Sequence, residues 1–278
     1  MVLKRTRKST PAPGRFVTLL SCPGGGVLAE ATIARGAVQC DVHELPEGAT
    51  SAASVKELAS VVVAALREHR VRSRDLLMAV PRSKAVLKPL MLPPNTAEDE
   101  IAAMVQFQLQ GEIPFPPEET VLDFAILRRD AEGVGVLAAA VQSATVDYWK
   151  SLAEQAGLSL KRLTLLPSAI QHGLCSTEAC EEKTIAVITQ LPGEMEIDVI
   201  SRGTILFSRS VTAAGPAEAL ATELIRSLRG YAGQHPAETL DDIVLIGDNA
   251  ETLAAAVGDA FSCAVRIEGQ SLDDAMGL

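Results

Sequence analysis

Residues 88–127 read KPLMLPPNTAEDEIAAMVQFQLQGEIPFPPEETVLDFAIL, and this stretch decides the fold. The Pro93-Pro94 pair excludes a helix at that point, and Thr96 then offers a side-chain oxygen to cap one. Three acidic residues follow in the predicted first turn, where the helix dipole favours negative charge. Apolar residues between Ile101 and Leu109 recur on one helical face. The helix ends before Gly111, and three prolines then impose an extended path into a strand over 121–127.

The flanking sequence arranges strands and helices in two similar halves. In the first half, apolar runs on both sides of a glycine-rich turn predict a hairpin. A helix, a buried strand and a later helix that stops at Gly157 follow it. The second half again begins with adjacent strands and ends with helix–strand units. We therefore predict an internal duplication, with mixed sheets flanked by helices and a boundary near residues 167–182. The predicted strands are 16–20, 27–33, 76–80, 121–127, 134–141, 184–189, 195–201, 204–210, 243–246 and 264–267, and the predicted helices are 55–66, 97–110, 146–156, 168–174, 216–231 and 251–261. Residues 158–166 are expected to connect two of these helices.

Composition and charge argue against several classes of function. The chain has 278 residues, 47% of them hydrophobic, which is typical of a folded protein. The net charge is −10, and this negative field argues against nucleic-acid binding. The one basic cluster, Lys4 to Lys8, is open to two interpretations: attraction to an anionic membrane, or a solvated terminal tail. No secretory signal or membrane-spanning apolar run is recognisable, so we expect a soluble protein.

Cysteine and other reactive residues do not form a recognisable catalytic or metal site. The five cysteines are odd in number and scattered, which is typical of reduced cytosolic thiols. Cys175 and Cys180 are the only close pair, and no second pair with a matching histidine cluster accompanies them. Trp149 lies on the apolar face of its predicted helix and is expected in the core. We predict no catalytic residues and no metal ligands.

Several short segments form an ordered series of motifs: Leu92-Pro93-Pro94, Glu100-Ile101, Gln110 to Phe115, Val121 to Phe124, Val136 to Ala140, Ala156 to Leu158, Leu163 to Pro167, and Gly203 to Ser210. Together they resemble the PilM family, the actin-like cytoplasmic proteins of type IV pilus assembly. Each motif alone is weak, but their order and spacing over roughly residues 15–270 are more specific. The resemblance implies an actin-like, ribonuclease H-like duplicated α/β fold of two domains. It also implies an inserted α+β subdomain in the first half.

The resemblance supplies domain limits for this sequence. Residues 1–14 are expected to form a disordered basic tail. Residues 15–167 would make the first actin-like half, with the inserted subdomain at about 76–166. Residues 168–278 would make the second half.

The nucleotide-binding turns of actin-like ATPases are degenerate in this sequence. Such turns pair an aspartate, which organises the metal ion, with a glycine that lets backbone amides approach the phosphates. Around Gly24, Gly25 and Gly26 there is no carboxylate, and Thr189 stands where the second aspartate is expected. The adenosine-side turn keeps only Gly247 of its glycine pair. We therefore expect no ATP hydrolysis, no bound ATP or Mg²⁺, and a protein that acts by binding other proteins.

The resemblance implies a partner and a place for it. The chain would hold the cytoplasmic tail of a PilN-like inner-membrane protein, and so lie in the cytoplasm, peripheral to that membrane. Self-association stays open. Two alternatives also remain: a weak actin-like ATPase that binds Mg-ATP, and a truncated cytoplasmic domain of the GspL type. The tail would dock on the inserted subdomain as an added strand or in a groove. The candidate contact residues are Ile101, Val105, Phe107, Ile113 and Phe115.

Overall fold

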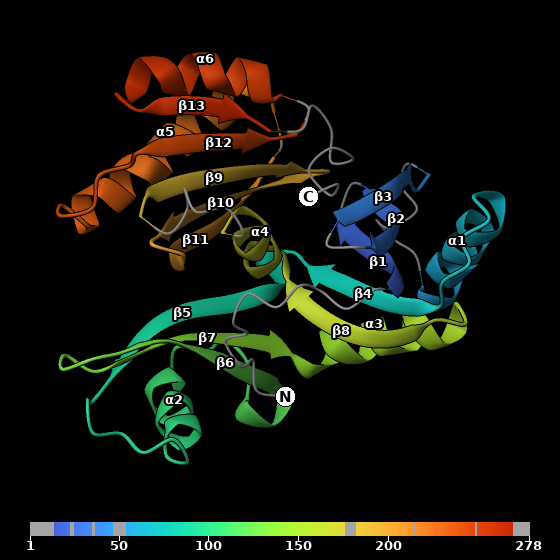
Figure 1. The fold of residues 1–278 in the computed structure, drawn as a ribbon, viewed down its shortest axis with the longest axis horizontal. Helices are drawn as coiled ribbons and strands as arrows, with labels where there is room; N and C mark the ends of the chain where they lie inside the picture. The colour runs from blue at the N-terminus through green and yellow to red at the C-terminus, as the bar shows by residue number, and fades with distance from the viewer. Residues whose placement is uncertain are drawn as a thin grey trace.

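The computed structural model describes residues 14–22, 25–34, 37–46, 54–175, 182–213, 215–247 and 249–268. These residues form two five-stranded sheets and one three-stranded sheet, with helices packed around them (Figure 1). The basic tail expected over residues 1–14 lies outside the described residues except for Gly14. The mixed α/β architecture that the sequence predicts is confirmed.

The first five-stranded sheet has the order β3-β2-β1-β4-β8. The hairpin β1–β2 is the predicted one, and β4 and β8 extend the sheet parallel to β1. The helices α1 and α3 pack against each other, and α3 also packs against β8. The elements are β1 (Gly14–Cys22), β2 (Gly25–Ala34), β3 (Ala37–Glu44), α1 (Val55–Glu68), β4 (Asp75–Val80), α3 (Ser143–Gln155) and β8 (Ser159–Leu165).

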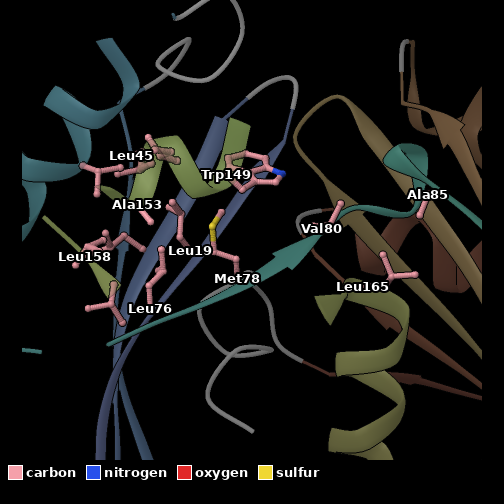
Figure 2. Close-up of a cluster of buried hydrophobic side chains, with 14 of the residues drawn as sticks. Leu19, Leu45, Leu76, Met78, Val80, Ala85, Trp149, Ala153, Leu158 and Leu165 are labelled. Atoms are coloured by element: carbon pink, nitrogen blue, oxygen red, sulfur yellow. The ribbon is translucent and has the colours of Figure 1, made fainter. Parts of the chain in front are cut away.

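Local sequence explains how these helices begin and what they bury. A capping box starts α1, because Ser54 Oγ accepts from Glu57 N while the Glu57 carboxylate accepts from Ser54 N at 2.9 Å. Trp149 of α3 is 6% exposed and lies in the main core, as predicted. Figure 2 shows it with Leu19 and Met78 of the sheet, members of the same buried cluster. Burial of this apolar face anchors both helices on the sheet.

The second five-stranded sheet repeats the first. Its order is β11-β10-β9-β12-β13, with two antiparallel pairs followed by two parallel pairs, as in the first sheet. The predicted internal duplication is therefore confirmed. The elements are β9 (Thr184–Leu191), β10 (Glu194–Ser201), β11 (Thr204–Thr212), α5 (Ala217–Gln234), β12 (Asp242–Ile246), α6 (Ala250–Ala260) and β13 (Ala264–Ile267).

Helix α4 (Leu166–Leu174) lies between the two large sheets (Figure 1). Gln171 Nε2 on this helix donates to the carbonyl oxygen of Gly203, in the β10–β11 turn, at 2.6 Å. The main buried cluster contains residues of both sheets, including Val17 of β1 and Val187 of β9. The main buried cluster thus spans both halves, while a second cluster lies within the second half alone.

The three-stranded sheet is inserted between β4 and α3 and has the order β5-β7-β6. Both outer strands run antiparallel to the central β7, and α2 packs on one face. Figure 1 shows α2 on the side of this sheet that is remote from the second large sheet. The elements are η1 (Arg82–Lys84), β5 (Ala85–Leu92), α2 (Ile101–Leu109), η2 (Pro117–Glu119), β6 (Thr120–Arg129) and β7 (Val134–Gln142).

Two local expectations need correction. Thr96 does not cap α2: its hydroxyl donates to the carbonyl oxygen of Pro93 at 2.7 Å, and the helix begins at Ile101 without a side-chain cap. The sequence pattern does not predict the strands β3, β5 and β8. Strand β5 contains Pro89, which lacks a backbone donor but is tolerated because β5 is an edge strand.

Candidate functional site

The first predicted phosphate turn joins β1 to β2. Gly25 and Gly26 begin β2 and are buried, whereas Gly24 lies outside the described residues. A Cβ atom added to Gly25 would lie 3.5 Å from Cγ of Pro192, in the β9–β10 turn of the second half. The turns that would flank a nucleotide phosphate from opposite sides are therefore in contact.

The second predicted position, Thr189, is buried in β9. Its side chain is 2% exposed, and its hydroxyl has no hydrogen-bond partner among the described residues. Thr189 lies opposite Glu196 of β10 in the strand register. The turn that follows is tight, with Gly193 at φ +83°. A single buried hydroxyl does not replace the carboxylate that would organise a magnesium ion.

The adenosine-side turn at Gly247 packs against the same strand. Gly247 has φ +117°, and a Cβ atom there would come within 2.7 Å of Gln190 Cβ and 3.0 Å of Gln190 O. The side-chain oxygen of Gln190 accepts from Asn249 N at 2.7 Å. Asp248 lies outside the described residues. The turn needs glycine because the backbone of β9 approaches it so closely, which is a structural reason unrelated to a nucleotide.

Apolar side chains occupy the place where the halves meet near these turns. Leu20 at the end of β1, Leu166 at the start of α4 and Leu191 at the end of β9 form one cluster, at most 6% exposed. A phosphate placed among them would lose its hydration without gaining a cation. Across the described ranges, no group of three Asp, Glu, His or Cys side chains is arranged to hold a metal ion.

A row of buried acids on β10 faces the first half of the chain. Glu194, Glu196 and Asp198 alternate along the strand and are 4%, 0% and 0% exposed. Glu194 Oε2 accepts from Ser210 Oγ at 3.0 Å. Glu194 Oε1, Glu196 Oε2 and both Asp198 oxygens have no hydrogen-bond partner within the described residues. Three acids buried together are costly unless they bind protons or a cation.

Burial shifts the proton equilibria of two of these acids. It raises the pKa of Glu196 to about 8, with a further rise from the neighbouring Asp198 charge and an opposing effect of the hydrogen bond from Arg82 N. Burial likewise raises the pKa of Asp198 to about 7, against the opposing effects of Ser208 and the Arg82 guanidinium. Both carboxyls therefore hold protons at a pH where exposed acids are ionised.

Arg82 brings the cation that faces this acidic row. It begins η1, directly after β4, and its backbone N donates to Glu196 Oε1. Its guanidinium donates to the carbonyl oxygen of Ala85, and burial lowers the pKa of Arg82 while the charges of Asp198 and Glu196 oppose that change. An open hollow of about 590 Å³ adjoins it, lined by polar residues of η1, β10 and β11. Arg82 lies where the inserted subdomain begins, and it thus links that subdomain to the second half.

The five partner-contact candidates lie in different environments. Ile101 and Val105 are 0% exposed in the core of the inserted subdomain, so they hold α2 on its sheet and are no longer candidates for a contact surface. Phe107 is 76% exposed on the outer side of α2. Ile113 and Phe115 are half-buried in the loop that follows, and Ile113 packs against the subdomain core.

Strand β6 presents an apolar strip that the sequence reasoning missed. Leu122, Phe124 and Ile126 are half-buried on the face that packs toward α2, next to Ile113. We call these four residues the β6 strip. Strand β6 is the outer strand of its sheet, and among the described residues no strand pairs with its other edge. An edge strand with half-buried apolar side chains can accept an extended peptide.

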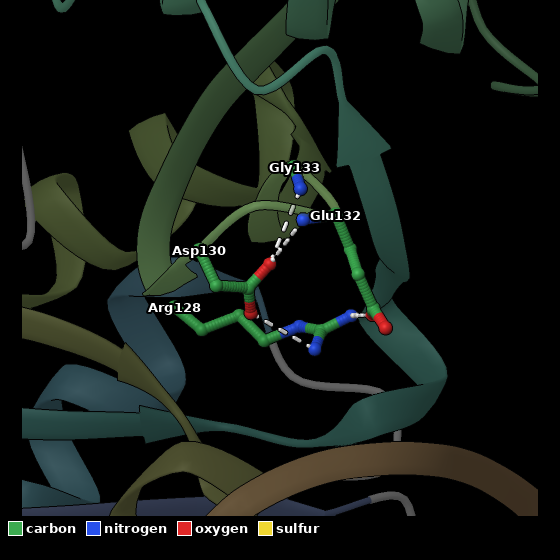
Figure 3. Close-up of polar contacts among 4 residues, drawn as sticks. All are labelled: Arg128, Asp130, Glu132 and Gly133. Atoms are coloured by element: carbon green, nitrogen blue, oxygen red, sulfur yellow. Dashed lines mark hydrogen bonds and ion pairs between the residues drawn. The ribbon is translucent and has the colours of Figure 1, made fainter.

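The β6–β7 turn holds this edge strand in place. Asp130 Oδ1 accepts from the backbone N of Glu132 and of Gly133 at 2.9 and 3.2 Å, and Asp130 Oδ2 accepts from Arg128 at 3.0 Å (Figure 3). Arg128 also donates to the carboxylate of Glu132 at 3.2 Å. The turn approaches the end of β5 so closely that a Cβ atom on Gly133 would collide with the carbonyl oxygen of Leu92. The end of β6 is therefore fixed on both sides.

Two remaining expectations concern thiols and membrane crossing. Cys40 and Cys263 are free thiols, and burial raises the pKa of each. Among the helices in the described parts of the chain, none is both long enough and apolar enough to cross a bilayer.

Comparisons with known proteins identify the family. A family described as type IV pilus assembly protein PilM matches residues 34–217, well over half of the chain. A solved PilM-PilN type IV pilus biogenesis complex is similar at 20% identity and TM-score 0.76, covering 92% of this chain and 88% of that chain. A Bacteroides thetaiotaomicron protein with an actin-like ATPase fold has 14% identity and TM-score 0.57, covering 94% and 93%. The cytoplasmic domain of EpsL, from the Vibrio cholerae type II secretion system, has 16% identity and TM-score 0.56, covering 84% and 82%.

The family match and the fold agree. The family region contains the inserted subdomain and the first strands of the second half, and the similar structures cover most of the chain. The resemblance seen in residues 88–127 is thereby confirmed. The chain belongs to the type IV pilus assembly protein PilM family and has the actin-like fold.

Proposed function

We propose that this chain is a non-catalytic scaffold of a type IV pilus assembly platform, in the cytoplasm at the inner membrane. Membership in the PilM family supports the pilus role. The single observation that carries the non-catalytic role is the leucine cluster at the ends of β1 and β9, where an actin-like ATPase needs charged groups. The scaffold acts through the surfaces it offers to other proteins.

The partner is the cytoplasmic tail of a PilN-like membrane protein. A structure with 20% identity to this chain is that of a PilM-PilN complex, which supports a partner of this class. The tail docks as an extended strand on the free edge of β6 and places apolar side chains on the β6 strip. Backbone hydrogen bonds along the edge supply affinity, and Leu122, Phe124 and Ile126 select apolar residues at alternate positions.

The free edge of β6 suits a peptide better than that of β5. Strand β5 contains Pro89, which cannot donate a backbone hydrogen bond, and it contacts β11 of the second half. On β6, Phe124 N donates to Asp123 Oδ1 at 2.9 Å. A docking peptide would offer a carbonyl oxygen to this amide in place of the side chain. We therefore assign the contact to β6.

Replacing Phe124 with Ala should weaken binding of the tail by about tenfold or more, because buried aromatic anchors dominate peptide interfaces. The measurement is fluorescence anisotropy with a labelled synthetic peptide that covers the cytoplasmic tail of the PilN-like protein from the same organism. Phe207→Ala is the matched control, since Phe207 is also half-buried on an outer strand but lies in the second half. Equal affinities for wild type and Phe124→Ala would remove β6 from the interface.

Isothermal titration calorimetry with Mg-ATP should give no saturable heat at nucleotide concentrations up to about 1 mM, a limit that corresponds to about 4 kcal/mol of binding free energy. The physical reason is the absence of charged groups from the Leu20, Leu166 and Leu191 cluster. A saturable, magnesium-dependent signal would contradict the non-catalytic reading and favour the weak ATPase alternative. The peptide measurement is independent of this result.

A further inference from the structure

Basic side chains gather at one edge of the first half, where the parallel strands β1, β4 and β8 begin. Arg15 lies at the start of β1, and Lys161 and Arg162 lie near the start of β8. The end of α1 and the loop before β4 add four arginines. We call this set the basic edge; its members are Arg15, Arg67, Arg70, Arg72, Arg74, Lys161 and Arg162, and all are exposed.

Hydrogen bonds tie these segments together. Ser73 Oγ donates to the carbonyl oxygen of Arg15 at 2.7 Å, which joins the β1 start to the loop before β4. Ser159 N donates to the carbonyl oxygen of Arg74 at 2.7 Å, which joins the β8 start to the same loop. Because β1, β4 and β8 are neighbours in this order, their amino ends form one continuous edge.

Nearby acids do not neutralise the edge. Glu30 Oε1 accepts from the backbone N of Arg72 and Ser73, both at 2.9 Å, so it binds main chain. Asp75 pairs with Lys161 at 3.4 Å. Within the described ranges, no carboxylate lies within ion-pair distance of the five arginines from β1, α1 and the following loop. Counted against Glu30, Asp75 and the exposed acids Asp41, Glu68 and Glu154, the seven basic residues leave a formal charge of +2, in a chain whose net charge is −10.

The sequence that precedes Arg15 is also basic. Residues 1–13 contain Lys4, Arg5, Arg7 and Lys8, with no acidic residue, and this segment joins the described chain at Gly14 beside Arg15.

We propose that the basic edge is a membrane-contact surface that binds an anionic lipid bilayer directly. A bilayer rich in anionic lipid presents a negative plane, and basic residues near it bind by short-range electrostatic attraction. A group of exposed basic residues at the end of a sheet can approach such a plane, and the bilayer repels the negative charge on the rest of the molecule, which orients this edge toward it. The membrane contact uses other residues than the peptide site on β6. Either proposal can therefore be wrong while the other holds.

The test is co-sedimentation of the full chain with vesicles of phosphatidylcholine containing about 30% phosphatidylglycerol, compared with pure phosphatidylcholine. We expect binding to the anionic vesicles alone, and loss of binding at about 1 M salt, where the Debye length is ~3 Å. The triple variant Arg70→Gln, Arg72→Gln, Arg162→Gln should bind about a hundredfold more weakly, since each basic residue contributes about fivefold.

The matched control is Arg202→Gln, Arg226→Gln, Arg229→Gln. It removes the same charge from exposed arginines of the second half, and Arg202 shares with Arg70 a positive φ, 49° against 55°. Unfolding curves of both triple variants verify that the folds persist. The proposal is overturned if the control loses as much binding as the edge variant, if neutral vesicles bind equally, or if an RNA duplex competes fully with the vesicles. It is also overturned if neutralising Lys4, Arg5, Arg7 and Lys8 abolishes binding while the edge variant binds normally.

Discussion

Replacing Glu196 with Gln is expected to raise the free energy of unfolding at pH 8 by roughly 3 kcal/mol. The side chain is 0% exposed, and burial raises its pKa from 4.5 to about 8. At about 1.4 kcal/mol per pKa unit, that change corresponds to at most about 5 kcal/mol. Glutamine keeps an oxygen to accept from Arg82 N and carries no charge to bury.

The direction in which the stability changes with pH follows from the raised pKa of Glu196. Between about pH 4.5 and 8 the folded chain retains a proton on Glu196 that the unfolded chain has lost, so stability falls as the pH rises through this window. Asp198, raised from 3.8 to about 7, acts in the same direction. The wild-type chain should therefore be less stable at pH 8 than at pH 5, and Glu196→Gln should reduce that difference.

Chemical denaturation followed by circular dichroism at pH 5 and pH 8 measures both effects. Glu118→Gln is the matched control, because Glu118 is exposed in η2 and its replacement should change stability by less than about 0.5 kcal/mol. If Glu196→Gln leaves the stability at pH 8 unchanged, or changes it equally at both pH values, then the carboxyl is not protonated in the folded chain.

The buried acids show where sequence reasoning fails. Glu194, Glu196 and Asp198 alternate with apolar residues, a pattern that normally indicates a strand with one solvated face. The strand was predicted correctly, but no role was assigned to its acids. In the folded chain this face is covered by η1 and the first half, a contact between segments more than one hundred residues apart. No pattern in the local sequence indicates that this face of β10 is buried.

Helix α2 gives a second example. Its apolar period indicates which residues share a face, and Ile101, Val105 and Leu109 do share one. The period does not indicate whether that face meets the chain itself or another protein. Here the inserted sheet covers it, so two predicted contact residues are core residues.

Features that depend on local chemistry were predictable. The glycine-rich turn at residues 23–26 gave the β1–β2 hairpin, and Gly157, at φ +68°, ends α3 as its sequence indicates. The absence of acids from the predicted phosphate turns was visible from residue identity alone. Their direct contact, through Gly25 and Pro192, required the three-dimensional arrangement of the halves. The strands β6 and β7 of the inserted subdomain were predicted from the sequence, but their grouping into an inserted unit came from the family resemblance.

Replacing Arg82 with Met should lower the free energy of unfolding at pH 8 by about 3 kcal/mol, because the buried carboxylates of Glu196 and Asp198 lose the positive charge that attracts them. Methionine keeps most of the apolar stem but removes the guanidinium that faces Glu196 and Asp198. At pH 5 the two acids are protonated in the folded chain, so less charge is left uncompensated and the loss should be smaller.

A double-mutant cycle separates this electrostatic effect from lost packing. On the Glu196→Gln background, one of the two carboxylates is absent, so Arg82→Met should cost about 1–3 kcal/mol less at pH 8 than it does in the wild-type chain. Lys84→Met is the control, because Lys84 is an exposed cation in the same short helix η1. Additive effects in the cycle, or an equal loss with Lys84→Met, would mean that Arg82 acts only by filling space. A coupling that grows with pH would instead show that the inserted subdomain is held to the second half by charge, since Arg82 stands at its root and the acids stand on β10.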